Sequence, residues 1–381
     1  MSESNILKKT SKSLPFKWYF DDGHYKKELN KIWNNEWIYA CHENNLKDPL
    51  CYITIRLANY NILILKDKNN TIKAYLNTCR HRGSIICDKD SGKLRSNILV
   101  CPYHQWSYDG SNGKLIKTSS FKIPKNFKTS DYSLKIIKIK IWNGLIFFNF
   151  NDSPIKWNNL NTFQDYDPVI NKIDLDNFHV GYIWKKIINC NWKIFWENYS
   201  ECLHCPNVHP NLSKLVPVYK RRLVDIKDDP NWKKLLKSNK PEFQSGLRKG
   251  AETWSVDGSA QGHKINFFKK SKKFPGHIYL TSWPSMFLVI FVDHIRIVRI
   301  LPINNEKTEI TSEWLFESKT MNDKKYNKNN VIDFAIEVMK EDSAACELNQ
   351  KGVHNFISHS GILMPEEYEI KKFHDWIRKK C

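Results

Sequence analysis

Two short stretches of the chain each combine one cysteine with one histidine. They are Cys79-Arg80-His81-Arg82-Gly83 and Cys101-Pro102-Tyr103-His104. A two-iron sulfide cluster with two thiolates on one iron and two neutral imidazoles on the other has a raised reduction potential and accepts electrons readily. Each stretch supplies one ligand of each kind. We therefore expect Cys79 and Cys101 to hold one iron, and His81 and His104 to hold the other.

The competing interpretation of these four residues is a Cys2His2 zinc site. Zinc fingers usually pair cysteine with cysteine and histidine with histidine, whereas both stretches here are mixed, which favours the iron–sulfur cluster. Five further cysteines have no matching partners and are expected to be buried or exposed thiols: Cys41, Cys51, Cys87, Cys190 and Cys381.

A second group of possible metal ligands lies in the segment from Glu197 to Pro210. Glu201 and His204 are three positions apart, so on a helix they would share a face. Pro206 and Pro210 break a helix, and the resulting bend can bring His209 back towards His204. Two imidazoles and one distant carboxylate would form the facial triad that leaves positions open on Fe(II) for O2.

The carboxylate of such a triad should come from another element, where Glu341 or Asp342 could serve. A zinc site built from Cys202, His204, Cys205 and His209 is the alternative for this segment. Zinc has no redox chemistry, and an electron-accepting cluster in the same chain calls for a redox-active partner, which favours iron.

The elements that would carry the first group form a small all-β region. A preceding amphipathic helix is expected over residues 20–37, with Leu29, Ile32 and Trp33 on its apolar side. Runs rich in β-branched residues, separated by Asp-Gly and Asn-Gly turns, then predict strands. These strands are expected at 52–57, 61–66, 72–76, 98–101, 136–142 and 145–150, followed by a linker at 151–161.

The second group lies in a region of mixed helices and strands. Helices are expected at 192–204 and 329–352, on either side of a loop at 220–250 and strands at 277–283, 287–292, 295–302 and 308–316. Strands flanked by helices predict an α+β fold with an antiparallel sheet. We expect an N-terminal helical segment (1–45) that packs on the catalytic domain, an all-β domain (46–155) and the catalytic domain (156–381).

The composition excludes several other classes of protein. With 41% hydrophobic residues the chain is globular, and its longest apolar stretches are too short to span a membrane. Residues 1–14 lack the apolar core of a signal peptide, so a cytoplasmic location is expected. The net charge of +20 comes from lysines spread along the chain, which argues against nucleic-acid binding and suits an acidic electron-donor protein.

Together these motifs resemble the α subunit of a Rieske non-haem iron oxygenase, over nearly the whole chain. The likeness includes the C-x-H-R-G and C-P-Y-H-Q-W stretches, Asn191-Trp192-Lys193 before the iron segment, and the Glu341-Asp342 pair. It implies an all-β Rieske [2Fe–2S] domain and a helix-grip-like catalytic domain. It also implies that His204, His209 and Asp342 ligate Fe(II), because Asp342 matches the second acid of the family's pair.

Glu201 matches the acidic residue that bridges a cluster-ligating histidine and an iron-ligating histidine in this family, here His104 and His204. Most members carry aspartate there. A glutamate resembles the branch of quaternary-ammonium monooxygenases, as does the run 281–316 with Trp283-Pro284 and Asp293-His294. The resemblance further implies a homotrimer and a separate NAD(P)H-dependent flavin/iron–sulfur reductase.

The expected activity is hydroxylation or N-demethylation, with O2, of a small quaternary ammonium compound such as glycine betaine, carnitine or choline. Such a cation needs aromatic faces, and the candidates are Tyr199, Trp254, Phe268, Tyr279, Trp283, Phe287 and Phe291. One alternative is an aromatic-ring hydroxylating dioxygenase, and another is a non-catalytic iron–sulfur electron carrier.

Overall fold

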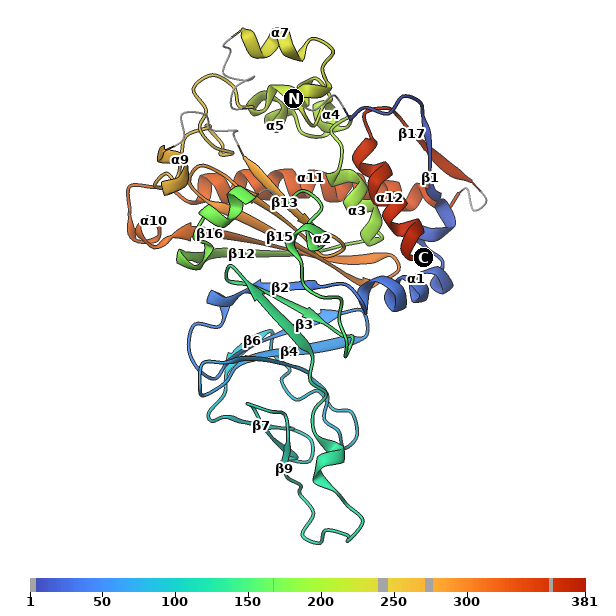
Figure 1. Ribbon diagram of the computed structural model, residues 1–381, viewed down its shortest axis with the longest axis vertical. Coiled ribbons are helices and arrows are strands. Elements are labelled where there is room, and N and C mark those ends of the chain that lie inside the picture. Colours follow the sequence, from blue (N-terminus) through green and yellow to red (C-terminus); the bar gives the residue numbers. More distant parts are fainter. Residues whose placement is uncertain (1–4, 167, 239–245, 271–276, 356–358) are drawn as a thin grey trace. The chain divides into compact units, whose positions relative to one another are not determined.

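The computed structural model describes residues 5–166, 168–238, 246–270, 277–355 and 359–381. The chain divides into two compact units. The discontinuous unit comprises residues 1–32 and 159–381, and the inserted unit comprises residues 33–158 (Figure 1). Our expected boundaries at 45/46 and 155/156 differ from this division. The segment 38–42 is a strand that pairs within the inserted unit, and Trp157 packs on Phe147 there.

The inserted unit is built from three antiparallel sheets. Their orders are β10-β11-β2, β5-β4-β3-β6 and β7-β8-β9. The strands are β2 (Ile38–His42), β3 (Cys51–Leu57), β4 (Tyr60–Lys66), β5 (Ile72–Leu76), β6 (Ser91–Lys93), β7 (Ile98–Val100), β8 (Ser107–Asp109), β9 (Leu115–Lys117), β10 (Lys138–Trp142) and β11 (Leu145–Asn149). All six expected strands are present, while β2 and the short β6, β8 and β9 were not predicted.

The discontinuous unit is centred on a five-stranded antiparallel sheet with the order β12-β16-β15-β14-β13. Its strands are β12 (Phe178–Ile188), β13 (Ile278–Ser282), β14 (Met286–Ile290), β15 (Ile295–Asn304) and β16 (Lys307–Glu317). The long helix α11 (Asn329–Val353) runs across this sheet (Figure 1). Its residues Val331 and Ile332 pack against Trp314 and Phe316 of β16. The expected α+β fold with an antiparallel sheet flanked by helices is therefore confirmed.

Shorter helices complete this unit. They are α1 (Asp22–Glu28), α2 (Asn159–Thr162), α3 (Trp192–Tyr199), α4 (Cys205–Val208), α5 (Pro210–Leu215), α6 (Pro217–Lys220), α7 (Trp232–Lys237), α9 (Asn266–Lys270), α10 (Ser318–Asn322) and α12 (Tyr368–Lys380). The helix predicted over 20–37 is too long. In the structure α1 ends at Glu28, and a π-helical turn at Leu29–Trp33 follows it. The expected loop at 220–250 contains α7, and its residues 239–245 lie outside the described residues.

The two ends of the chain meet in the discontinuous unit. Strand β1 (Ser11–Pro15) pairs antiparallel with β17 (Ser360–Leu363), and Arg378 of α12 donates hydrogen bonds to the carbonyls of Lys12 and Ser13. Both ends also reach α3, because Tyr19 donates to a Glu197 carboxylate oxygen at 2.6 Å and His374 Nε2 lies 2.8 Å from the same oxygen. The terminal segments thus help to hold the helix that leads to the second group of ligands.

Candidate metal centres and substrate cavity

The two Cys/His stretches of the inserted unit form two similar loops, one after β5 and one after β7. In each loop the cysteine carbonyl accepts the N–H of the residue four positions later, Gly83 or Gln105, at 3.0 Å. Both of these residues have positive φ, +79° and +57°, a backbone conformation that glycine adopts without strain. The Cys79 and Cys101 side chains are 3% and 1% exposed, and the rings of His81 and His104 lie with their centroids 4.7 Å apart.

The electrostatics of these loops differ between the two cysteines, because burial raises the pKa of Cys79 whereas the pKa of Cys101 is lowered. Burial acts to raise the pKa of Cys101, but the backbone N–H groups of Tyr103 and His104 outweigh it, and the pKa is lowered. Tyr108 Oη lies 3.1 Å from Cys79 Sγ. Partial desolvation of the ring, followed by the influence of His104 and Arg82, lowers the pKa of His81, so its imidazole is neutral at physiological pH. The two loops thus offer a pair of sulfurs and a separate pair of imidazoles, a donor set that fits two irons.

Helix α3 positions the second group of ligands. Its N-cap Asn191 accepts the Lys193 N–H at 3.0 Å, and the buried Lys193 ammonium binds Glu28 of α1 at 2.6 Å. Glu28 also accepts the Trp192 indole N–H at 2.8 Å. The helix ends at Tyr199, so the expected helix over 192–204 is too long and Glu201 and His204 lie in the turn that follows it.

The prolines act as expected on the segment after this turn. Pro206 and Pro210 stand in the first turns of the short helices α4 and α5, and His209 lies between the two helices. This path brings the rings of His204 and His209 to a centroid separation of 5.2 Å. One ligand atom each from His204, His209 and Asp342 lies within 4.8 Å of the other two. Such a set of two imidazoles and a carboxylate fits a non-haem Fe(II).

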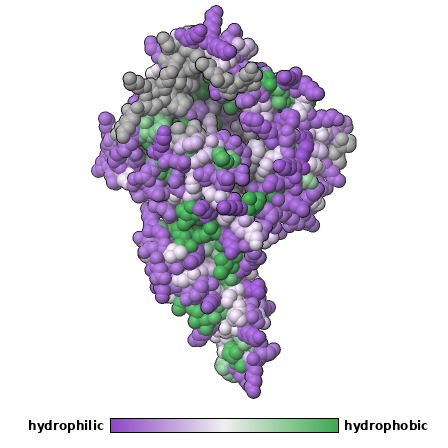
Figure 2. Space-filling model, in the orientation of Figure 1, coloured by the Kyte–Doolittle hydropathy of each residue, from purple (hydrophilic) through white to green (hydrophobic). Residues whose placement is uncertain are grey.

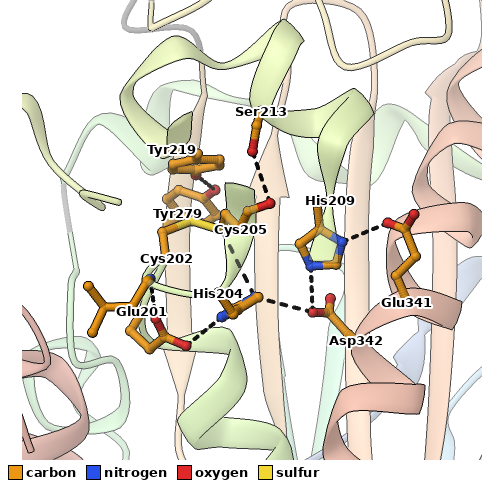
Figure 3. Close-up of a disulfide and its surroundings, with 11 residues drawn as sticks. Glu201, Cys202, His204, Cys205, His209, Ser213, Tyr219, Tyr279, Glu341 and Asp342 are labelled. Atoms are coloured by element: carbon orange, nitrogen blue, oxygen red, sulfur yellow. Dashed lines mark hydrogen bonds and ion pairs between the residues drawn. A yellow bond between two sulfur atoms is a disulfide. The ribbon is translucent and has the colours of Figure 1, made fainter. Parts of the chain in front are cut away.

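The structure distinguishes between the two acids of α11 (Figure 3). Asp342 Oδ1 lies 2.8 Å from His209 Nε2 and 3.5 Å from His204 Nε2. Glu341 instead lies 2.7 Å from Nδ1, on the far side of the His209 ring. A carboxylate in that place fixes the tautomer and orientation of a metal-binding histidine. Asp342 therefore faces the Nε2 atoms of both imidazoles, whereas Glu341 lies behind His209.

Glu201 has the corresponding place behind His204. Its carboxylate contacts His204 Nδ1 and also accepts the Leu203 N–H. Burial acts to lower the pKa of His204, but Asp342 and Glu201 outweigh it and raise the pKa to about 9. Burial acts to raise the pKa of Asp342, but His204 and His209 outweigh it and lower the pKa to about 2. The site thus attracts positive charge, which a divalent cation can supply.

Cys202 and Cys205 are joined by a disulfide beside His204 (Figure 3). Because the two sulfurs bond to each other, they are not available as thiolates, so the zinc set of Cys202, His204, Cys205 and His209 is wrong for this structure. The two cysteines face each other because α4 begins at Cys205, one turn after Cys202.

A cavity of about 820 Å³ opens beside this site in the discontinuous unit, and His204, His209 and Asp342 lie on its wall. Four of the seven aromatic residues expected in the pocket also line it: Tyr199, Trp254, Tyr279 and Trp283. Phe268, Phe287 and Phe291 are buried without being among the lining residues. Among the lining residues that were not predicted from the sequence are Tyr219, His277 and Arg296. Of these only Arg296 gives a signal, as a charge within the apolar run 295–301.

Comparison with known proteins identifies the family. Residues 175–381 match the ring hydroxylating alpha subunit (catalytic domain), and residues 36–128 match the Rieske [2Fe-2S] domain. The first match covers more than half of the chain, so the chain belongs to the ring-hydroxylating alpha-subunit family. The protein is an oxidoreductase that incorporates O2, and its cofactors are a Rieske [2Fe–2S] cluster and a non-haem iron. The zinc interpretations and the non-catalytic carrier are therefore wrong.

Several relatives resemble the chain along most of its length. The glycine betaine monooxygenase oxygenase subunit of Chromohalobacter salexigens is 25% identical, over 96% of this chain and 84% of the relative. The chloroplastic choline monooxygenase of Spinacia oleracea is 24% identical, over 96% and 77%. The fold is shared with the quaternary ammonium Rieske monooxygenase CntA in complex with L-carnitine (TM-score 0.73, 18% identity, 97% and 96% covered). Among the residues that the structure describes, no helix has the length and apolarity needed to cross a membrane.

Proposed function

We propose that this chain is the oxygenase component of a Rieske monooxygenase that hydroxylates or N-demethylates a small quaternary ammonium compound such as glycine betaine, carnitine or choline. The observation that carries this proposal is the aromatic cavity: Tyr199, Tyr279 and Trp254 share its wall with the imidazole–carboxylate site. Aromatic faces attract a cation that has no hydrogen bond to donate. Relatives named for glycine betaine and choline support the same substrate class.

In this proposal Cys79, Cys101, His81 and His104 hold the cluster, and His204, His209 and Asp342 hold the mononuclear iron. When bound, the cluster supplies electrons one at a time and the iron activates O2 for attack on a C–H bond. The chain's own contribution is to fix the ligands. Glu201 and Glu341 each hold the Nδ1 side of one imidazole, so that both Nε2 atoms face Asp342. The cavity wall holds the substrate next to them.

Glu201 is also proposed to link the two centres. Its carboxylate contacts His204 on one side, and we expect its other hydrogen bond to reach His104 of a neighbouring subunit in a homotrimer. In a quaternary ammonium Rieske monooxygenase related in fold, electrons transfer between subunits. Hydrophobic patches interrupt the visible surface of the inserted unit (Figure 2). The exposed residues of this unit include Ile98, Val100 and Tyr103, at 41%, 48% and 59%. Such a surface suits contact with another protein.

We further propose a cytoplasmic location and a separate NAD(P)H-dependent flavin/iron–sulfur reductase. The excess of 20 positive charges would favour encounter with an acidic donor protein. No nucleic acid or membrane is expected as a partner.

The test is aerobic turnover of the iron-loaded protein with a surrogate reductase. Glycine betaine, carnitine, choline and a set of benzoates are compared for NADH consumption and, with the ammonium compounds, for formaldehyde. We expect NADH consumption to depend on a quaternary ammonium compound. Turnover of benzoates alone would contradict the proposal and favour the aromatic-ring dioxygenase.

A further inference from the structure

Arg296 is a buried cation on the cavity wall, and within the described part of the chain its side chain has no hydrogen-bonding partner. It lies on β15, its side chain is 6% exposed, and it lines the cavity. Its Nε has no acceptor, and among the described residues no ion pair or hydrogen bond engages its guanidinium. Burial lowers the pKa of Arg296, but the ordinary value of arginine is so high that the group stays charged. A buried charge in this state is unfavourable unless an anion meets it.

The carboxylates on the same wall are already engaged. Glu201 binds His204, and Asp342 lies between the two imidazoles of the iron site. Asp165 accepts the backbone N–H of Thr281 at 2.6 Å and its hydroxyl at 3.0 Å. The remaining acidic residues of the lining, Asp225 and Glu369, contact Lys227 and Lys372. Among the described residues no carboxylate forms an ion pair with the guanidinium, so an anion that enters the cavity can pair with it.

Apart from the carboxylate of Asp342, the groups that act on the charge of Arg296 are aromatic. Its Cζ lies 6.0 Å from the centre of the Phe287 ring, and the phenols of Tyr279 and Tyr199 lie near it. Burial raises the pKa of both phenols, so both are uncharged at physiological pH. Their hydroxyl groups can donate hydrogen bonds to an anion but do not neutralise the guanidinium.

Four rings form an aromatic corner on the same wall: Tyr219, Trp254, His277 and Tyr279. Trp254 lies 5.9 Å from Tyr219 and 5.6 Å from His277 between ring centroids, nearly perpendicular to both. His277 lies 4.5 Å from Tyr279, and the two tyrosine hydroxyls are 3.0 Å apart. Burial lowers the pKa of His277 to about 4, so this corner carries no positive charge and can accept an ammonium group.

We propose that the cavity is specific for a zwitterion, with Arg296 pairing with a carboxylate of the substrate while the aromatic corner takes its quaternary ammonium group. This inference rests on the proposed function and decides between its substrates. A betaine brings the anion that the guanidinium lacks. A substrate with a positive charge alone, such as choline, would place a second cation in a buried site and leave Arg296 unpaired.

Glycine betaine and choline are matched probes, because they differ only in a carboxylate against a hydroxymethyl group on the same trimethylammonium. Anaerobic calorimetric titration of the iron-loaded protein measures their dissociation constants. We expect glycine betaine to bind at least about tenfold more tightly than choline. Arg296→Met should weaken the binding of glycine betaine by about 10- to 100-fold and leave the binding of choline unchanged or tighter. Arg296→Lys should keep part of the preference for glycine betaine over choline.

Arg299→Met is the matched control. Arg299 is a buried arginine of the same strand, but it bonds Thr311 at 3.2 Å and does not line the cavity. Its substitution should leave the ratio of the two dissociation constants unchanged, even if it lowers stability. Equal binding of both probes by the wild type, or equal weakening of both by Arg296→Met, would overturn the inference and leave the quaternary-ammonium function standing. Binding of benzoate with neither probe bound would overturn both.

Discussion

The two candidate metal centres differ in how the chain encloses them. In the inserted unit the two cysteines are buried and His81 is exposed, so the imidazole side of the set faces outward. In the discontinuous unit His209 is 1% exposed and lies beside a cavity of about 820 Å³. An electron must cross a protein surface, whereas attack on a C–H bond must exclude competing reactions with water. The difference in exposure matches this difference in task.

The centres also differ in how they are assembled. The first needs two loops of one small unit. The second joins the turn after α3 to α11, and it depends on Glu28 near the start of the chain through Lys193. Substitutions at the second centre should therefore leave the first centre intact. The visible spectrum of the cluster then serves as an internal control for variants of the second centre.

The largest expected effect is the separation of the two centres by substitution of single ligands. Asp342→Ala should abolish turnover and lower the iron content from about three to about two per chain, with the cluster's visible spectrum retained. Cys101→Ser should remove that spectrum and leave about one iron. Iron analysis and visible absorption measure both. Loss of the cluster spectrum in Asp342→Ala would contradict the independence of the centres.

Breaking the ion pair beneath α3 should affect one unit only. Lys193→Met leaves Glu28 charged and fully buried, which should lower the free energy of unfolding of the discontinuous unit by about 3–5 kcal/mol. Tryptophan fluorescence during denaturation measures this loss. The denaturant midpoint at which the visible absorption of the cluster disappears should be unchanged, because that signal reports the inserted unit. The double variant Glu28→Gln/Lys193→Met is the control and should recover most of the stability. If it recovers none, the cost does not come from the unpaired carboxylate.

Glu201→Gln should separate electron transfer from iron binding. We expect unchanged iron content and a fall in coupled turnover of about 10- to 100-fold. Glu341→Gln is the matched control, since it loses the same kind of contact with the other imidazole. It should weaken iron binding by about tenfold and leave the rate of cluster reoxidation per bound iron unchanged. Equal effects of the two substitutions on that rate would refute a specific link through Glu201.

The smallest expected effect is on acid stability. Burial lowers the pKa of His277 to about 4 from its ordinary 6.5, so between these values the unfolded chain binds a proton that the folded chain does not. Stability is therefore lost as the pH falls through this range, by about 2 kcal/mol between pH 7 and about pH 5. Denaturant unfolding of His277→Gln should lack this part of the pH dependence. An identical dependence in both proteins would show that His277 is not held neutral.

The inserted unit was largely predictable because its signals are local. Cys79, His81, Cys101 and His104 stand in two short motifs, and the strands around them are marked by turns. His204 and His209 could also be found from their spacing and the prolines. The choice between Glu341 and Asp342 could not be made from charge and spacing alone, because it depends on the rotation of α11 against a segment far away in the sequence. Only the family resemblance favoured Asp342.

The cavity wall was the least predictable part. Whether an aromatic residue of the sheet faces the cavity or the core depends on the packing of α3 and α11. Tyr279, for example, lines the cavity, whereas Phe287 is buried and is not among the lining residues. The end of α3 at Tyr199 was missed because the residues after it do not break a helix until Pro206. Arg296 stands in a run that predicts a buried strand, and a charge in such a run is a signal that deserves weight.

The pairing of β1 with β17 has a consequence for synthesis on the ribosome. Strand β1 can form its pairing with β17 only after residues 360–363 have emerged from the ribosome. The inserted unit has all its residues by Asn158 and can complete its sheets while most of the remaining chain is untranslated. Its thiols can thus be matured early, whereas the discontinuous unit closes only after residues 360–363 have emerged.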